Sequence, residues 1–234
     1  MAVTTADGRV LVIQLGMSGR MTVSSDPPTR QAKNDDPHAH VTWRCRVGRR
    51  DGLWVVFRDP RRFGGLTALP GPAELHERWS LLGPDALLAS PTTLGERLAS
   101  VRRSVKAALL DQAVVAGVGN IYADESLYRS GIHPITRLDR LSGPKRDRLV
   151  AELQGVLAAA VASGGSTLRD YVDGDAREGG YQSYHLIYGR AGEACRRCGD
   201  SFRGSVVAGR TTVHCPTCQP LIHKGRGEAR RTRR

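Results

Sequence analysis

Short apolar and β-branched runs separated by polar loops dominate the first third of the chain. Residues 9–15 form an apolar run with the length of a buried strand. Residues 40–47 alternate roughly in polarity, and residues 53–57 are β-branched and aromatic, so both segments predict strands. The Pro- and Asp-rich stretch 24–37 predicts a loop. We therefore expect a β domain over residues 1–88.

The hydrophobic period changes after this region. Apolar residues recur at helical spacing in two segments, namely Leu94, Leu98, Val101, Val105, Leu109 and later Leu149, Leu153, Val156, Leu157, Val161. Between the two segments, a Gly117-Val118-Gly119 turn leads into a helix that Asn120 is placed to cap and that Gly131 ends. We expect a helical domain over residues 89–165.

Four cysteines near the end of the chain form two Cys-x2-Cys pairs with sixteen residues between them: Cys195, Cys198, Cys215 and Cys218. Thiolates at this spacing can close tetrahedrally on one Zn²⁺. Two short strands with a Gly-bearing hairpin between the pairs predict a zinc ribbon, and four protein thiolates make the zinc structural. Two disulfides are the alternative, which the unpaired fifth cysteine, Cys45, and the lack of a signal peptide disfavour. We expect a loop segment and the ribbon over residues 166–220, and a basic disordered tail over residues 221–234.

Charge narrows the kind of partner. The formal net charge is +12 and the isoelectric point about 10.2, which favours a polyanion such as nucleic acid over a merely basic surface. A hydrophobic content of 40% is enough for real cores, and no apolar run reaches the length of a membrane span. The free N–H groups and positive helix end at Asn120 then predict an anion site, although a plain corner between two helices is also compatible with that turn.

Seven sequence blocks follow one another along nearly the whole chain to Gln219. They are Gln14-Leu15-Gly16-Met17-Ser18-Gly19, His38-Ala39-His40-Val41, Arg58-Asp59-Pro60-Arg61-Arg62-Phe63-Gly64, Leu82-Gly83-Pro84, residues 109–125, Gly164-Gly165-Ser166-Thr167-Leu168-Arg169-Asp170 and Tyr188-Gly189-Arg190. In this order, before a zinc ribbon, they resemble the formamidopyrimidine-DNA glycosylases, bacterial base-excision repair enzymes. The resemblance implies an α+β multidomain fold: a partial N-terminal β-sandwich, a central helix-two-turn-helix domain and a C-terminal zinc ribbon.

The resemblance gives three residues a role at the lesion. Met17, Arg61 and Phe63 would fill the gap that an everted base leaves in the stack, because an apolar wedge and an Arg offset the lost stacking and pairing. Without the resemblance, the sequence alone favours core positions for Met17 and Phe63.

The resemblance places three further residues on the DNA backbone. Asn120 and Arg210 would hold the phosphates that flank the everted nucleotide. Lys106 would face the DNA backbone, and its alternative is a solvated helix lysine. The polar stretch 173–180 corresponds to a mobile loop over the extruded base. His38 and His40 lie on a strand and are expected to serve structure or DNA contact, so we assign no metal to them.

The start of the chain departs from the family pattern. Members begin, after removal of Met, with Pro-Glu-Leu-Pro-Glu, whose proline amine attacks the sugar C1′ and whose adjacent glutamate handles protons. This chain begins Met1-Ala2-Val3-Thr4. We expect that the catalytic proline and glutamate, a strand lysine and the first helix and strands have no counterpart in these residues. A recorded start at an internal methionine and a truly short protein are the two explanations.

The predicted function is excision of oxidised purines (formamidopyrimidine and 8-oxoguanine) from DNA, with strand cleavage at the abasic site. The predicted partner is damaged double-stranded DNA, and we expect a monomer in the bacterial cytoplasm, at the nucleoid. A non-catalytic protein that recognises damaged DNA is the first alternative. A zinc-ribbon protein of transcription or translation is the second, and it would not need the blocks at residues 14–19 and 58–64.

Overall fold

The chain divides into two compact units. A computed structural model describes residues 1–26, 36–48, 50–167 and 177–222. One unit comprises Met1–Trp79 and Ala160–Ser183, and the other comprises Ser80–Ala159 and Tyr184–Arg234. This division differs from the predicted ranges because the segment after Ser80 joins the helical core through Ala86, and because the segment after Ala160 groups with the strands. The predicted tail lies largely outside the described residues.

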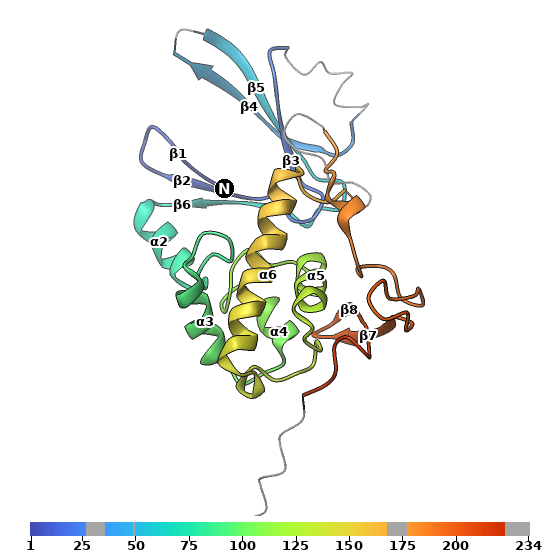
Figure 1. Ribbon diagram of the computed structural model, residues 1–234. Coiled ribbons are helices and arrows are strands. Elements are labelled where there is room, and N and C mark those ends of the chain that lie inside the picture. Colours follow the sequence, from blue (N-terminus) through green and yellow to red (C-terminus); the bar gives the residue numbers. More distant parts are fainter. Residues whose placement is uncertain (27–35, 49, 168–176, 223–234) are drawn as a thin grey trace, which may run out of the picture. The chain divides into compact units, whose positions relative to one another are not determined.

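The strands of the first unit form two three-stranded antiparallel sheets (blue to teal in Figure 1). The first sheet has the order β1-β2-β6, with β1 at Ala2–Thr4, β2 at Val10–Gln14 and β6 at Gly65–Leu69. The second has the order β3-β5-β4, with β3 at Arg20–Ser24, β4 at Ala39–Val47 and β5 at Arg50–Arg58. The predicted strands 9–15, 40–47 and 53–57 correspond to β2, β4 and β5.

The sheets bury side chains on both of their faces. Val10, Val12 and Ile13 of β2 and Val56 and Phe57 of β5 are buried, and because neighbouring residues of a strand point to opposite faces, Ile13 is buried on the face opposite to Val10 and Val12. The first unit also contains the short helix α2 (Pro72–Ser80), which has no buried residue, and most of the 3₁₀ turn η2 (Tyr181–Tyr184).

Four helices and a 3₁₀ turn build the second unit. They are α3 (Pro91–Ala99), α4 (Val105–Leu109), α5 (Asn120–Ser130), η1 (Leu138–Arg140) and α6 (Gly143–Ala162), whose last residues belong to the first unit. Ser90 caps α3 by accepting a 3.1 Å hydrogen bond from the Thr93 N–H, and Pro91 begins the helix. The core of the second unit includes five fully buried leucines: Leu94, Leu98, Leu109, Leu127 and Leu149.

The helical period of residues 94–109 is interrupted in the structure. The chain leaves α3 after Ala99 and re-enters a helix at Val105. The first N–H groups of α4 are satisfied from a later segment: Val105 donates to the Thr136 carbonyl at 2.8 Å and Lys106 to the Pro134 carbonyl at 3.1 Å. These bonds between distant parts of the chain set the helix start that the local pattern did not predict.

The zinc ribbon completes the second unit. Strands β7 (Arg203–Val207) and β8 (Arg210–His214) pair in antiparallel register, as predicted. Ala208 and Gly209 form the connecting turn with φ of 50° and 71°, the backbone of a primed two-residue hairpin. Within the part of the chain that the structure describes, no helix has the length and apolar character needed to cross a membrane.

Candidate nucleic-acid interface and zinc centre

The four predicted cysteine ligands converge. The Cys195 Sγ lies 3.8 Å from the Cys218 Sγ, and the Cys198 Sγ lies 3.5 Å from the Cys215 Sγ. All four sulfur atoms lie within 4.8 Å of one another. Tetrahedral zinc with Zn–S bonds of about 2.3 Å needs sulfur atoms about 3.8 Å apart, so the donor set fits one structural Zn²⁺. The four cysteines are free thiols in the structure, which agrees with zinc and not with the disulfide alternative.

Groups around the cysteines supply hydrogen bonds to the sulfur atoms. The backbone N–H of Arg197 donates to the Cys195 Sγ at 3.4 Å, and that of Cys218 donates to the Cys215 Sγ at 3.3 Å. The Tyr128 hydroxyl lies 3.2 Å from the Cys195 Sγ. Burial, reinforced by this sulfur, raises the pKa of Tyr128, so its hydroxyl keeps the proton that it donates. Such contacts orient metal ligands and offset thiolate charge.

Two residues of helix α5, Glu125 and Tyr128, bind the zinc ribbon and the segment before it. Its Glu125 is fully buried and accepts hydrogen bonds from three consecutive backbone N–H groups, those of Leu186, Ile187 and Tyr188, at 2.9–3.0 Å. Within the ribbon, Arg197 contacts the same helix: its guanidinium stacks 4.3 Å from the Tyr128 ring centroid and donates to the Tyr128 carbonyl at 2.9 Å. The segment before the ribbon and the turn of the first cysteine pair are therefore fixed to α5 by charged hydrogen bonds as well as by apolar packing.

Lys106 is buried, which corrects the expectation that it faces the DNA backbone. Its side chain has no solvent exposure, and its Nζ donates to Asp124 Oδ1 at 2.6 Å. The same Nζ donates to the Thr212 hydroxyl at 2.7 Å and the Thr211 carbonyl at 3.0 Å. A charge removed from water in this way requires partners, and here they come from α5 and β8. Lys106 therefore joins α4, α5 and the ribbon hairpin.

Burial opposes ionisation at both members of this ion pair. Desolvation raises the pKa of Asp124 to about 6, although Lys106 and the Val213 N–H at 3.2 Å favour its charged form. Desolvation likewise lowers the pKa of Lys106, and the charge of Asp124 opposes that change. Their mutual contact, together with the hydrogen bonds to Thr211, Thr212 and Val213, makes two buried charges tolerable.

Asn120 and the hairpin that carries Arg210 lie together. The Asn120 Nδ2 donates to the Thr211 carbonyl at 2.9 Å, one residue beyond the exposed Arg210. Gly119 and not Asn120 is the N-cap of α5: Asn120 is the first helical residue, and its side chain bonds to the hairpin instead of to its own helix. The turn, the N-terminus of α5 and the hairpin thus form one surface on which N–H groups and a guanidinium can bind anions.

The three predicted wedge residues lie on two loops of the first unit. Met17 and Phe63 are exposed, at 56% and 59% of their surface. This exposure excludes the alternative that they are core residues. Arg61 is exposed too, and its guanidinium carbon lies 4.7 Å from the Phe63 ring centroid.

Some sequence expectations concern residues without a described position. Residues 173–176, the first half of the predicted mobile loop 173–180, lie outside the described residues. At the start of the chain, the Met1 amino group donates to the Ile13 carbonyl at 3.0 Å. The expectation that the family's catalytic proline and glutamate have no counterpart stays a prediction.

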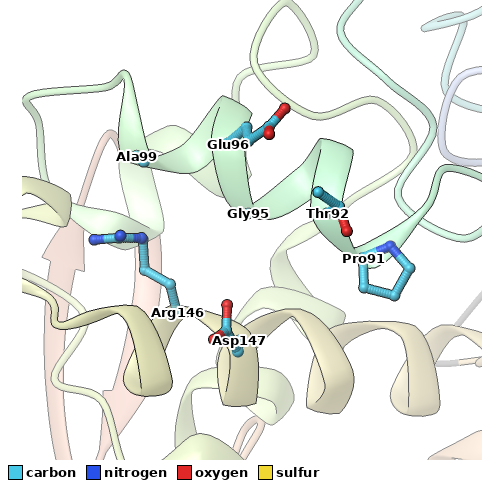
Figure 2. A pocket seen from close by; sticks show the side chains of 7 residues that line it. All are labelled: Pro91, Thr92, Gly95, Glu96, Ala99, Arg146 and Asp147. Atoms are coloured by element: carbon cyan, nitrogen blue, oxygen red, sulfur yellow. The ribbon is translucent and has the colours of Figure 1, made fainter.

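A pocket of about 450 Å³ in the second unit is distinct from all the predicted site residues. Figure 2 shows Glu96 projecting from α3 and Arg146 and Asp147 projecting from α6. Two carboxylates beside one guanidinium disfavour a phosphate ligand. The candidate interface residues are therefore Asn120 and Arg210 in the second unit and, separately, the residues of the wedge loops in the first unit, and not those of this pocket.

Comparisons with known proteins identify matches along the chain. The N-terminal domain model of formamidopyrimidine-DNA glycosylase matches residues 1–66, and the helix-two-turn-helix domain model of the same enzyme matches residues 82–172. A zinc finger found in formamidopyrimidine-DNA glycosylase and isoleucyl-tRNA synthetase matches residues 192–221.

Curated relatives and solved structures agree with these matches. Formamidopyrimidine-DNA glycosylases of Thermomicrobium roseum and Geobacillus kaustophilus are 41% and 42% identical, over 92% and 91% of this chain and 76% of each relative. The crystal structure of the Thermus thermophilus MutM (Fpg) protein has a TM-score of 0.77 at 37% identity, over 94% of this chain and 79% of that one. Lactococcus lactis Fpg in complex with DNA containing an abasic site has a TM-score of 0.76 at 29% identity, over 94% and 78% of the two chains. This chain belongs to the formamidopyrimidine-DNA glycosylase family.

Proposed function

We propose that this protein is a base-excision repair DNA glycosylase with AP-lyase activity that binds damaged duplex DNA and acts on oxidised purines. Family membership supports the glycosylase and lyase chemistry. The observation that carries the proposal for this chain is the bond between Asn120 and Thr211, which joins the N-terminus of α5 to the hairpin of Arg210.

The residue roles follow from chemistry. Asn120 and Arg210 contact phosphates, because an amide at a helix N-terminus and an exposed guanidinium suit oxyanions and read no base. Met17, Arg61 and Phe63 occupy the space of the everted base. Lys106 makes no DNA contact in this proposal and positions the hairpin through Asp124 and through its own hydrogen bonds to Thr211 and Thr212. The protein works as a monomer at the bacterial nucleoid.

Binding and cleavage assays test the proposal separately. Binding is measured by fluorescence anisotropy with a duplex that contains a tetrahydrofuran abasic-site analogue and with the undamaged duplex. Cleavage is measured on duplexes that contain 8-oxoguanine or formamidopyrimidine. We expect tighter binding to the analogue than to the undamaged duplex, and strand cleavage at the lesion would identify the protein as an active glycosylase and lyase. Equal affinity for both duplexes would contradict damage recognition.

A non-catalytic damage-binding protein is the second candidate. It would bind damaged duplex through the same residues, Met17, Arg61, Phe63, Asn120 and Arg210, and would supply no nucleophile. Selective binding without cleavage, with the Thermus thermophilus protein as positive control for cleavage, would support this second candidate.

A further inference from the structure

Two loops of the first unit meet at a buried hydrogen-bonded centre. The loop of residues 15–19 carries Met17, and the loop of residues 59–64 carries Arg61 and Phe63. The Ser18 hydroxyl of the first loop donates to Asp59 Oδ1 of the second at 2.7 Å. Ser18 is 4% exposed and Asp59 is 1% exposed, so this bond is shielded from water although it lies beside exposed loop residues.

Ser18 and Asp59 each accept further hydrogen bonds besides the one that joins them. The Ser18 hydroxyl oxygen accepts the Arg61 N–H at 3.2 Å. The second carboxylate oxygen of Asp59 accepts the Gly64 N–H at 2.6 Å, and its carbonyl accepts the Arg62 N–H at 3.2 Å. The backbone on both sides of Phe63 and Arg61 is therefore tied to these two side chains.

The loops also approach at backbone distance. A Cβ at Gly16, whose φ is 63°, would lie 2.7 Å from the Phe63 carbonyl carbon and 2.8 Å from the Gly64 nitrogen. Any side chain at position 16 would force the loops apart, and the positive φ disfavours one as well. The flanks of Met17 and Phe63 are thus in direct contact, while the two side chains project into solvent.

The Asp59 carboxylate is the charged member of this centre. Burial raises the pKa of Asp59, but hydrogen bonds from Ser18 and Gly64 outweigh burial and lower the pKa overall. Asp59 is therefore ionised at neutral pH, and charge-assisted hydrogen bonds are stronger than neutral ones. His40 adds a ring nitrogen 2.9 Å from the Asp59 carbonyl oxygen.

We infer that Ser18 and Asp59 are positioning residues, which hold Met17 on one loop and Arg61 and Phe63 on the other in the arrangement that fills the gap of an everted base. The inference rests on the proposed function. A wedge that is already ordered loses less conformational freedom when it enters the stack, so its binding energy is available for separating the bases.

The test measures base unstacking and does not depend on strand cleavage. The probe is a duplex with a tetrahydrofuran abasic-site analogue and 2-aminopurine next to it, whose fluorescence rises when it unstacks. The Ser18→Ala variant leaves the Arg61 N–H and one Asp59 oxygen unpartnered. We expect its unstacking constant to fall roughly tenfold, while its affinity for undamaged duplex is unchanged. Ser25→Ala, an exposed serine of the same unit, is the matched control and should behave like the unaltered protein.

A double-mutant cycle separates positioning from general folding. If Ser18 acts through the wedge, Ser18→Ala in a Met17→Ala background should lose much less than in the unaltered protein. Asp59→Asn, which keeps the side-chain shape and removes the charge, serves as the second variant if Ser18→Ala unfolds, as judged by circular dichroism.

Three outcomes are distinguishable. Coupling between Ser18→Ala and Met17→Ala, with normal thermal unfolding, supports the inference. The inference is overturned if the effects of Ser18→Ala and Met17→Ala on the unstacking constant simply multiply in the double variant. It is also overturned if unstacking is unaltered in both Ser18→Ala and Asp59→Asn. An unaltered protein that fails to unstack 2-aminopurine at the abasic-site analogue overturns the proposed function instead.

Discussion

The ammonium group of Lys106 donates a 2.6 Å hydrogen bond to the carboxylate of Asp124, and neither side chain is exposed to solvent. The pair lies where α4, α5 and β8 meet, directly behind the hairpin that carries Arg210. It links the packing of the helical core to the placement of the proposed phosphate-binding surface. Removing one partner therefore affects stability and the geometry of that surface together.

Lys106→Met should destabilise the second unit by about 3–5 kcal/mol, because it leaves a buried carboxylate without its cation. The loss should grow with pH. The folded-state pKa of Asp124, already raised to about 6, rises further without Lys106, whereas the unfolded value stays near 3.8. The folded state then binds the proton more tightly than the unfolded state does, so the free energy of unfolding falls as pH rises through that range.

Urea unfolding at pH 5 and pH 8 in the presence of zinc measures this effect. Lys145→Met, an exposed lysine of α6, is the control and should change little. Adding Asp124→Asn to Lys106→Met should remove the extra pH dependence. A Lys106→Met variant as stable at pH 8 as at pH 5, relative to the unaltered protein, would contradict the buried pair.

Cys198→Ser should abolish stoichiometric zinc binding. The Cys198 Sγ lies 3.5 Å from the Cys215 Sγ, and a serine hydroxyl is a poor substitute for a thiolate at a four-sulfur site. Metal analysis of purified protein should give one zinc per chain for the unaltered protein and for Cys45→Ser, and much less for Cys198→Ser. Full occupancy in Cys198→Ser would rule this cysteine out as a ligand.

Glu125→Gln should loosen the ribbon from α5. The carboxylate accepts three backbone N–H groups, whereas an amide offers one oxygen and turns two donors toward the same site. We expect a loss of about 1–3 kcal/mol, faster hydrogen exchange at Leu186, Ile187 and Tyr188, and faster zinc loss to a chelator. The exposed Glu193 provides the control, Glu193→Gln. Unchanged exchange at these three amides would show that Glu125 does not anchor the segment.

Local patterns predicted several of the elements but not the break between α3 and α4, and contacts between distant residues determine the site. The hairpin between the cysteine pairs and the end of α5 at Gly131, with its left-handed backbone, depend on neighbouring residues and were predicted. The partners of Lys106 are 18 and 106 residues away along the chain, and those of Ser18 are 41 and 43 residues away. No hydrophobic period encodes such pairs, so the burial of Lys106 was not predicted: the resemblance implied a DNA contact, and the local pattern implied a solvated helix lysine.

One signal for the missed residues was present in the sequence. Asp124 and Glu125 follow each other inside a helix that also carries Ala123, Leu127 and Tyr128. Two adjacent acids on a helix this apolar cannot both avoid the core, and buried acids need partners. The identity of those partners, a lysine for one and three amides for the other, required the tertiary structure.

Arg210→Ala should weaken binding to damaged and undamaged duplex alike, because a phosphate contact carries no sequence or lesion information. Removing one such contact reduces the slope of log K against log salt by about one counterion.

Arg203→Ala is the matched control: Arg203 is also exposed, on the other strand of the same hairpin, so both variants remove one positive charge from the ribbon. Titrations of both duplexes from low to moderate salt, followed by anisotropy, give the slopes. We expect the larger loss of affinity and of slope in Arg210→Ala, since Asn120 bonds to the residue next to Arg210 and places that side of the hairpin at the helix N-terminus. Equal losses of affinity in the two variants would mean that Arg210 contributes only its positive charge and makes no specific phosphate contact. A loss confined to the damaged duplex would mean that Arg210 acts at the lesion and not on the DNA backbone.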